Sequence, residues 1–296
     1  MIRGPLAVVL CSLALVTMPL AAVAQVDLSR MIDTARKTTD LGDKDLEEEQ
    51  ELGEQMAATL LGAAPLSTRE AEQAYVARVG HWVARHSSRP ELQWRFAVLD
   101  DDTVNAFAAP AGHVFITRGL LLQLNSEAEL AGVLAHEIAH VTRKHHLDAI
   151  KKAAGMEVAG GVLGMVRGRR GESRTERMVG DRVVGATREL YSRGLDRGDE
   201  YEADRWAVTY MARAGYDPFA FAAVLQWLDS VVAEDSRVAL LFTTHPAPAE
   251  RLERVAEQLT GPYSGLSGKV LDERFVQTLG GNLQVDTGGG ISQDSE

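Results

Sequence analysis

The feature that most constrains this chain is the pentapeptide HEIAH, because it lies in a segment with a well-defined helix start. Ser126 is followed three residues later by Glu129 and then by an apolar run. This capping box predicts a helix that begins at the serine and runs past the pentapeptide. At about 100° per residue, His136 and His140 lie about 40° apart on that helix, and Glu137 lies about 60° beyond His140. Both imidazoles can therefore meet one metal ion, and Glu137 can reach its water.

The N-terminal segment limits which other ligands are available. Arg3 precedes an apolar run that is too short to span a bilayer, and the small-residue sequence AVA follows the run. We therefore predict a secretory signal peptide over residues 1–24, cut after Ala24. The one cysteine, Cys11, lies inside that segment. The mature chain would have neither disulfides nor thiolate ligands, so histidine and carboxylate must hold any metal.

Composition narrows the class of protein further. A net charge of -11 is opposite in sign to that of a typical nucleic-acid-binding protein, so no nucleic-acid partner is expected. A hydrophobic content of 45% supplies a sizeable core, and no linker-like stretch divides the middle of the chain. We predict a single domain over residues 25–279 and a disordered C-terminal tail over residues 280–296, where little can pack.

Hydrophobic periodicity indicates both helices and strands. Apolar residues at four-residue spacing predict amphipathic helices over residues 46–60 and 69–86. The stretch QWRFAVL alternates as a half-buried strand does, and NAFA, PAG and HVFIT predict a strand-turn-strand unit. Pro218 and Pro248 mark the starts of two later helices.

The strand-turn-strand unit is a candidate for substrate binding. An edge strand there could pair with the backbone of an extended polypeptide, which suits unfolded substrates. The residues expected to contact the substrate are Asn105, Ala106, Phe107, His113 and Phe115. In the alternative interpretation, the two phenylalanines simply fill the core.

An arginine-rich segment over residues 167–188 has three interpretations. A solvated loop is the simplest. The alternatives are a lid over a cleft and a peripheral membrane contact with anionic lipid headgroups.

A catalytic zinc ion usually has three protein ligands and one open position, so a third ligand is required. His146 has the spacing of a third histidine in one large class of zinc peptidases. That class needs a glycine where this chain has Arg143. We therefore expect His145 and His146 to be solvated residues near the helix end.

A better third ligand lies in the stretch DRGDEYEADRWA. If this stretch is helical, Glu200 and Asp204 share one face and Glu202 points to the opposite side. Glu200 would then bind the metal, and Asp204 could accept a hydrogen bond from the second ring nitrogen of a ligand histidine. For this stretch alone, an acidic solvent-facing surface is an equally good interpretation.

The motifs HEIAH, EYEAD and THPAPAERL occur in an order and at gaps that resemble one zinc metallopeptidase family. That family includes the CaaX prenyl endopeptidases, the HtpX heat-shock protease and soluble periplasmic relatives of the BepA type. The similarity extends from about Glu47 to Leu259. It implies a gluzincin-type metallopeptidase domain, α+β and mainly helical, with a small antiparallel sheet beside the zinc-binding helices. It also implies one Zn²⁺ per chain, held by His136, His140 and Glu200.

The resemblance implies a role near the zinc for His245, in the His-Pro pair. This histidine would donate to the oxyanion, occupy the open zinc position at rest, or do both; the alternative is a structural histidine in the core or a loop, made rigid by Pro246. In many relatives a Ser-Arg pair closely precedes the ligand glutamate. Here Ser192-Arg193 lies further upstream, and Arg197 is the alternative basic residue.

The function implied is that of a periplasmic zinc-dependent endopeptidase with Glu137 as general base. Its substrates would be unfolded or misassembled envelope proteins, in particular outer-membrane protein precursors. The alternative is a chaperone-like zinc-binding module that handles the same precursors with little proteolysis.

Overall fold

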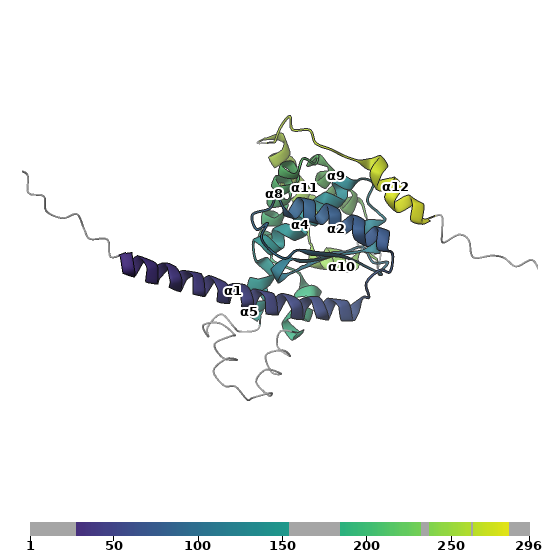
Figure 1. The fold of residues 1–296 in the computed structure, drawn as a ribbon. Helices are drawn as coiled ribbons and strands as arrows, with labels where there is room; N and C mark the ends of the chain where they lie inside the picture. Colours follow the sequence, from purple (N-terminus) through teal and green to yellow (C-terminus); the bar gives the residue numbers. More distant parts are fainter. Residues whose placement is uncertain (1–27, 154–183, 232–236, 262, 284–296) are drawn as a thin grey trace, which may run out of the picture. The chain divides into compact units, whose positions relative to one another are not determined.

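The computed structural model describes residues 28–153, 184–231, 237–261 and 263–283. The predicted signal peptide, most of the arginine-rich segment and the chain after Leu283 lie outside these residues. The chain divides into two compact units, Met1–Lys44 and Asp45–Glu296. Helix α1 (Leu28–Ala63) begins in the first unit and ends in the second, and all other described elements belong to the second (Figure 1). In the described ranges, no helix combines the length and apolar character that a membrane span requires.

A three-stranded sheet forms from the segments that the alternation pattern indicates. It consists of β1 (Arg95–Leu99), β2 (Ala106–Ala109) and β3 (His113–Thr117), in the order β1-β3-β2. A 3-10 turn, η1 (Pro110–Gly112), joins β2 to β3, which pair antiparallel as expected. The expectation of a wholly antiparallel sheet is wrong, because β1 pairs with β3 in parallel. Alternation within a strand reports its buried face and carries no information about its neighbour.

The two faces of the sheet pack against different helices. Side chains of alternate residues, Phe96, Val98, Val114 and Ile116, join the main core, to which α2 (Glu70–Ala84) also contributes. The opposite face, with Phe107 and Phe115, packs against Ala57 and Leu60 near the end of α1. The sheet is therefore buried on both sides, and both phenylalanines fill a core.

The other described elements of the second unit are helices. They are α3 (Arg118–Leu121), α4 (Glu127–Thr142), α5 (His145–Ala153), α8 (Arg197–Ala214), α9 (Phe219–Ser230), α10 (Ala239–Thr244), α11 (Pro248–Thr260) and α12 (Asp272–Leu283). A further helical segment spans residues 184–193. Helix α12 packs through buried Phe275 and Leu279. It ends at Leu283, so residues 280–283, the start of the predicted disordered tail, are helical.

Helix α4 is the central element of the core, since all its residues except Glu129 are buried. Its start is the predicted one, because the Ser126 hydroxyl accepts a hydrogen bond of 3.1 Å from the Glu129 amide. The reciprocal bond of the capping box differs: the Glu129 carboxylate accepts from the Asn125 amide at 2.6 Å. Ala203 and Ala207 of α8 are fully buried and permit close approach of α8 to α4.

The first turn of α4 also carries a buried carboxylate that ties three segments together. Glu127 accepts hydrogen bonds of 2.6 Å from the hydroxyls of Tyr75 and Tyr216, and one of 2.7 Å from Arg274 Nε. Burial raises the pKa of Glu127, but the hydrogen bonds from Arg274 and the two tyrosines outweigh it and hold that pKa below its ordinary value. Glu127 thus anchors the end of α4 that lies far from the HEIAH motif.

Candidate metal centre

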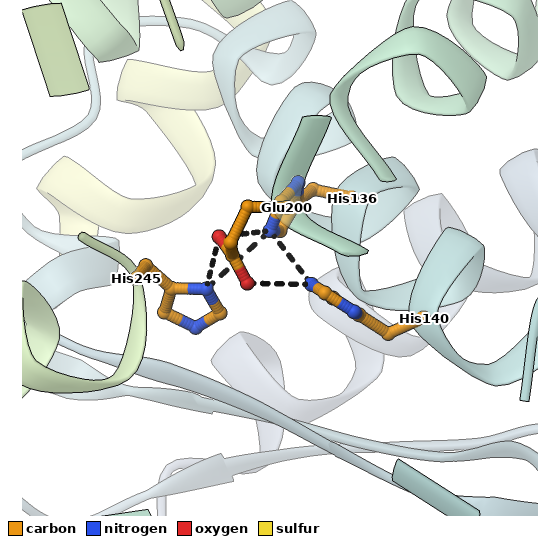
Figure 2. Close-up of side chains that lie close together, drawn as sticks. All are labelled: His136, His140, Glu200 and His245. Carbon is orange, nitrogen blue, oxygen red and sulfur yellow. Dashed lines mark hydrogen bonds and ion pairs between the residues drawn. The ribbon is translucent and has the colours of Figure 1, made fainter. Parts of the chain in front are cut away.

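Four buried side chains from three segments converge beside α4 (Figure 2). His136 and His140 lie one turn apart on α4, as the helical period requires. Glu200 comes from the first turn of α8, and His245 directly follows α10. One potential ligand atom from each of the four lies within 4.8 Å of the other three.

The separations between these atoms fit a small tetrahedral cation. The Nε2 atoms of His136 and His140 are 3.0 Å apart, and they lie 3.5 and 3.3 Å from the Glu200 carboxylate. Bonds of about 2.0 to 2.1 Å in tetrahedral geometry place ligand atoms roughly 3.3 Å from one another. Glu200 Oε1 is buried and makes no hydrogen bond within the described chain, which is expected of an oxygen that coordinates a metal ion. The residues present therefore fit a metal such as zinc.

His245 supplies a fourth nitrogen to the same cluster. Its Nδ1 lies 3.0 Å from Glu200 Oε2 and 3.4 Å from His136 Nε2. These distances match those among the other three groups. The side chain thus stands where a fourth donor would stand, and a catalytic metal site keeps that position open for water or substrate.

A buried ion pair between Asp204 and Arg251 contacts His136 and Glu200. Asp204 Oδ1 lies 2.9 Å from His136 Nδ1, which orients the imidazole so that Nε2 faces the cluster. Arg251 donates to both Asp204 oxygens, at 2.8 and 2.7 Å, and its Nη1 lies 3.3 Å from Glu200 Oε2. The Arg251 side chain is only 3% exposed, so its charge acts on the site with little screening.

Arg251 was not expected at the site from the sequence, although its position in α11 carried a signal. Val255 and Leu259 follow it at four-residue spacing and are buried, so Arg251 occupies the core-facing stripe of α11. An arginine in such a stripe needs a buried acidic partner. Arg193 and Arg197, whose roles the sequence left open, are mostly exposed and pair with surface glutamates.

The electrostatics of the cluster favour binding of a cation. Burial and Arg251 lower the pKa of His136, but hydrogen bonds with Asp204 and Glu200 raise it overall to about 9. Burial raises the pKa of Glu200, yet His245 and Arg251 hold it well below its ordinary value. The carboxylate is therefore ionised, and a metal that binds His136 must displace its proton.

Glu137 lies next to the cluster without belonging to it. The side chain is buried, with Oε1 at 3.7 Å from His245 Nε2 and Oε2 without a hydrogen bond within the described chain. Burial raises the pKa of Glu137, although His245 and His136 oppose the shift. A buried carboxylate with a free oxygen and a raised pKa suits a group that takes up a proton and later returns it.

Three nearby polar residues lie outside the cluster. The expectation that His145 and His146 are solvated is wrong, because both are buried: α4 ends at Thr142, Lys144 has a positive φ of 63°, and a new helix, α5, begins at His145. His145 Nδ1 lies 3.0 Å from His140 Nδ1, and its Nε2 lies 3.3 Å from Glu202. His145 therefore links Glu202 to the cluster.

The predicted substrate-contacting residues divide between two places. Ala106 and Phe107, at the start of the edge strand β2, line small cavities that also contain His245. The Asn105 side chain is buried, and its Oδ1 accepts from the Ala106 amide at 2.9 Å. His113 and Phe115 lie on the central strand β3 and do not line these cavities. His113 Nδ1 is 3.1 Å from the Pro110 carbonyl, with which it can form a hydrogen bond.

The free edge of β2 is partly occupied by the chain itself. The Tyr191 hydroxyl, from the helical segment 184–193, donates to the Ala108 carbonyl at 2.7 Å. Burial, together with Glu137, raises the pKa of Tyr191 well above its ordinary value, so the hydroxyl remains a donor. Its ring also packs edge-on against Phe107 and face-on against His146.

A small apolar cavity of about 40 Å³ opens beside Glu137 and His136. A cavity needs about 10 to 15 Å³ to hold one water molecule, so this one can hold a water molecule or a small apolar group. Its apolar lining comes from α4, α9 and α10, mainly from Val133, Phe221, Val224, Leu225, Leu228 and Leu241.

Together, the HExxH helix, the glutamate of a second helix and the carboxylate beside them define a metallopeptidase centre. The sequence pattern of peptidase family M48 matches residues 70–259, which include every group described in the cluster. The chain belongs to this family.

Three similar proteins carry protease names, and each is longer than this chain. The chain is 27% identical over 208 residues to the beta-barrel assembly-enhancing protease of Escherichia coli strain K12, covering 69% of this chain and 42% of that protein. It is 30% identical over 181 residues to a putative beta-barrel assembly-enhancing protease of Vibrio cholerae, covering 60% and 37%. Mitochondrial metalloendopeptidase OMA1 of Schizosaccharomyces pombe is 27% identical over 200 residues, covering 62% and 52%. The chain thus spans about half the length of these relatives or less.

Proposed function

We propose that this metallopeptidase is a zinc-dependent endopeptidase that hydrolyses unfolded or misassembled proteins of the bacterial envelope. One observation carries the proposal. The ligand atoms of His136, His140 and Glu200 lie 3.0 to 3.5 Å apart, and beside them lies Glu137, whose Oε2 makes no hydrogen bond within the described residues. Histidine nitrogen and carboxylate oxygen are the donors of zinc hydrolase sites in chains that supply no thiolate.

Zinc bound by these three residues would lower the pKa of a water molecule to about 7 and polarise the scissile carbonyl. Side chains of the protein carry out the proton transfers and hold the ligands in position. Glu137 takes the proton from the attacking water and passes it to the departing amide nitrogen. Asp204 and Arg251 keep His136 in one orientation while charge moves through the site.

His245 has two roles in this proposal. Its Nε2 faces Glu137, so a small movement of the loop before α11 would let the imidazole donate to the developing oxyanion. At rest, its Nδ1 stands in the position of a fourth metal ligand. This second placement also favours the alternative function, in which a chaperone-like protein retains the metal and rarely cuts.

Substrate binding would use the edge strand β2. An extended polypeptide pairing with this edge must displace the Tyr191 hydroxyl from the Ala108 carbonyl. The apolar cavity beside Glu137 then receives a small apolar side chain next to the scissile bond. Unfolded chains offer both a free backbone and such side chains.

The cellular setting rests on separate observations. The names of the bacterial relatives refer to beta-barrel assembly, which supports outer-membrane protein precursors as substrates. A signal peptide over residues 1–24 would deliver the protein to the periplasm. N-terminal sequencing of protein from a periplasmic extract should begin at Gln25, and an intact Met1 in the cytoplasmic fraction would contradict this location.

The catalytic proposal is tested by casein hydrolysis with zinc content measured on the same samples. Glu137→Gln should retain zinc and lose hydrolysis, whereas Glu253→Gln, an exposed change on α11, should retain both. Substantial turnover by Glu137→Gln would refute the mechanism. Wild-type protein that binds zinc and does not cut would support the chaperone-like alternative.

A further inference from the structure

A second cavity lies at the opposite end of the core helices from the metal centre. Its volume is about 520 Å³, and it is bordered by α2, the start of α4, the end of α8 and the segment that leads into α12. Glu127 precedes His136 by nine positions on α4, which is about 14 Å along the helix axis. Ala214 follows Glu200 by fourteen positions on α8, or about 21 Å. The cavity is therefore separate from the catalytic site.

The charge of this cavity is opposite to that of the whole chain. Four cationic side chains line it, those of Arg78, Arg85, Lys269 and Arg274, against the single carboxylate of Glu127. That carboxylate is already bound by Arg274 and two tyrosines. Such a gathering of positive charge in a chain of net charge -11 requires an explanation.

Three of the cations have no acidic partner. Within the residues that the structure describes, no salt bridge or side-chain hydrogen bond engages Arg78, Arg85 or Lys269. Arg78 lies over the ring of Tyr75, with its Cζ 5.0 Å from the ring centroid, and this contact leaves its N–H groups free. The three side chains are exposed and available to a soluble anion.

Besides His81 and Tyr216, the rest of the cavity lining is mainly apolar. Val79, Ala214 and Leu271 line it, together with the ring of Trp82, which is 46% exposed. Trp82 Nε1 donates to the Ala214 carbonyl at 2.8 Å, which fixes the indole between α2 and the end of α8. A ligand for this cavity must therefore bring negative charge and apolar surface within a few ångströms of each other.

We propose that this cavity binds the C-terminal residue of a polypeptide, with its carboxylate on Arg78, Arg85 and Lys269 and an apolar side chain against Trp82. The last residue of a chain carries both features on one Cα atom. An internal aspartate or glutamate brings the charge without the apolar side chain, and free phosphate lacks apolar surface altogether. The choice of a polypeptide rests on the proposed function, and the site would anchor one end of a substrate at a distance from the metal.

The test is a binding measurement that needs no hydrolysis. Full-length Glu137→Gln protein with zinc is titrated against an N-terminally labelled octapeptide that ends in leucine, as the free acid and as the C-terminal amide. Fluorescence anisotropy is followed at 0.15 M salt. The acid should bind about 10-fold more tightly than the amide, because only the acid brings a charge to the exposed cations. An octapeptide with an internal glutamate and a C-terminal amide should bind no better than the plain amide.

Charge-reversal variants locate the site. Arg85→Glu and Lys269→Glu should each remove most of the preference for the acid. Arg205→Glu, an equal charge change on an exposed arginine of α8 outside the cavity, should leave it intact. Trp82→Ala should weaken the binding of both the acid and the amide peptide.

Several outcomes would overturn the proposal. Equal binding of acid and amide would exclude recognition of a terminal carboxylate. Loss of the preference in Arg205→Glu would show a general charge effect, and displacement of the peptide by an equal concentration of inorganic phosphate would show a simple anion site. Binding to phosphatidylglycerol vesicles that depends on Arg85, without a peptide preference, would assign the cavity to lipid. Because binding is measured, an absence of proteolysis leaves this result interpretable.

Discussion

Replacement of Arg251 by methionine should strongly destabilise the protein. The Arg251 side chain is 3% exposed and donates two hydrogen bonds to Asp204, at 2.8 and 2.7 Å, while its Nη1 lies 3.3 Å from Glu200. Methionine occupies a similar space but leaves the carboxylates of Asp204 and Glu200 buried without that charge. Removing one partner of a buried ion pair typically costs about 3 to 5 kcal/mol.

The assay is thermal and urea unfolding of protein from which metal has been removed with a chelator, since bound metal adds its own stabilisation. In a domain of this size, about 1 kcal/mol corresponds to roughly 2 to 4 °C, so the melting temperature should fall by roughly 6 to 20 °C. Arg205→Met is the matched control. That arginine lies on α8 with its side chain 64% exposed, so its weak pair with Glu202 should contribute less than about 1 kcal/mol.

A double variant separates the ion pair from simple loss of packing. Asp204→Asn combined with Arg251→Met removes both charges, so the free energy of unfolding should fall by less than the sum of the two single changes. The difference should be about 1 to 3 kcal/mol. If Arg251→Met melts within a few degrees of Arg205→Met, or if the two changes at the pair are simply additive, the electrostatic role assigned to Arg251 is wrong.

Four further outcomes follow from the site and the core. Glu200→Gln should lose bound zinc in elemental analysis while Glu202→Gln retains it, and the reverse result would refute the helical-face assignment. His245→Ala should keep the metal and cut casein about 100-fold more slowly if the imidazole mainly serves the oxyanion. It should cut faster if the imidazole mainly blocks the open position, and unchanged rates would reject both roles. Tyr191→Phe should lower the KM for unfolded casein, because the edge of β2 is freed, and an unchanged KM would argue against pairing at that edge. The lowered pKa of Glu127 means that its stabilisation is full above the unfolded pKa of about 4.5 and is lost as pH falls through the folded value. Chelated wild-type protein should therefore lose more stability than Glu127→Gln between pH 6 and pH 3 in urea unfolding, and parallel losses would contradict the assignment.

The sequence alone determined those features that depend on local periodicity. The helical period places His136 and His140 one turn apart and puts Glu200 and Asp204 on one face, whatever the rest of the chain does. Ser126 and Pro248 define helix starts by local hydrogen bonding and by a fixed φ angle, and both starts are found in the structure. Side-chain period and capping need only a few neighbouring residues, so they can be recognised without knowledge of the fold.

Only the tertiary structure decided which faces meet. The packing of α8 against α4 sets the distance from Glu200 to the two histidines, and the loop before α11 brings His245 Nδ1 within 3.0 Å of the same carboxylate. The parallel pairing of β1 with β3 and the pairing of Arg251 with Asp204 depend on partners far away in the chain. Such contacts form because burial of apolar surface across the whole core outweighs the loss of chain entropy, and no local pattern records which distant segment supplies that surface.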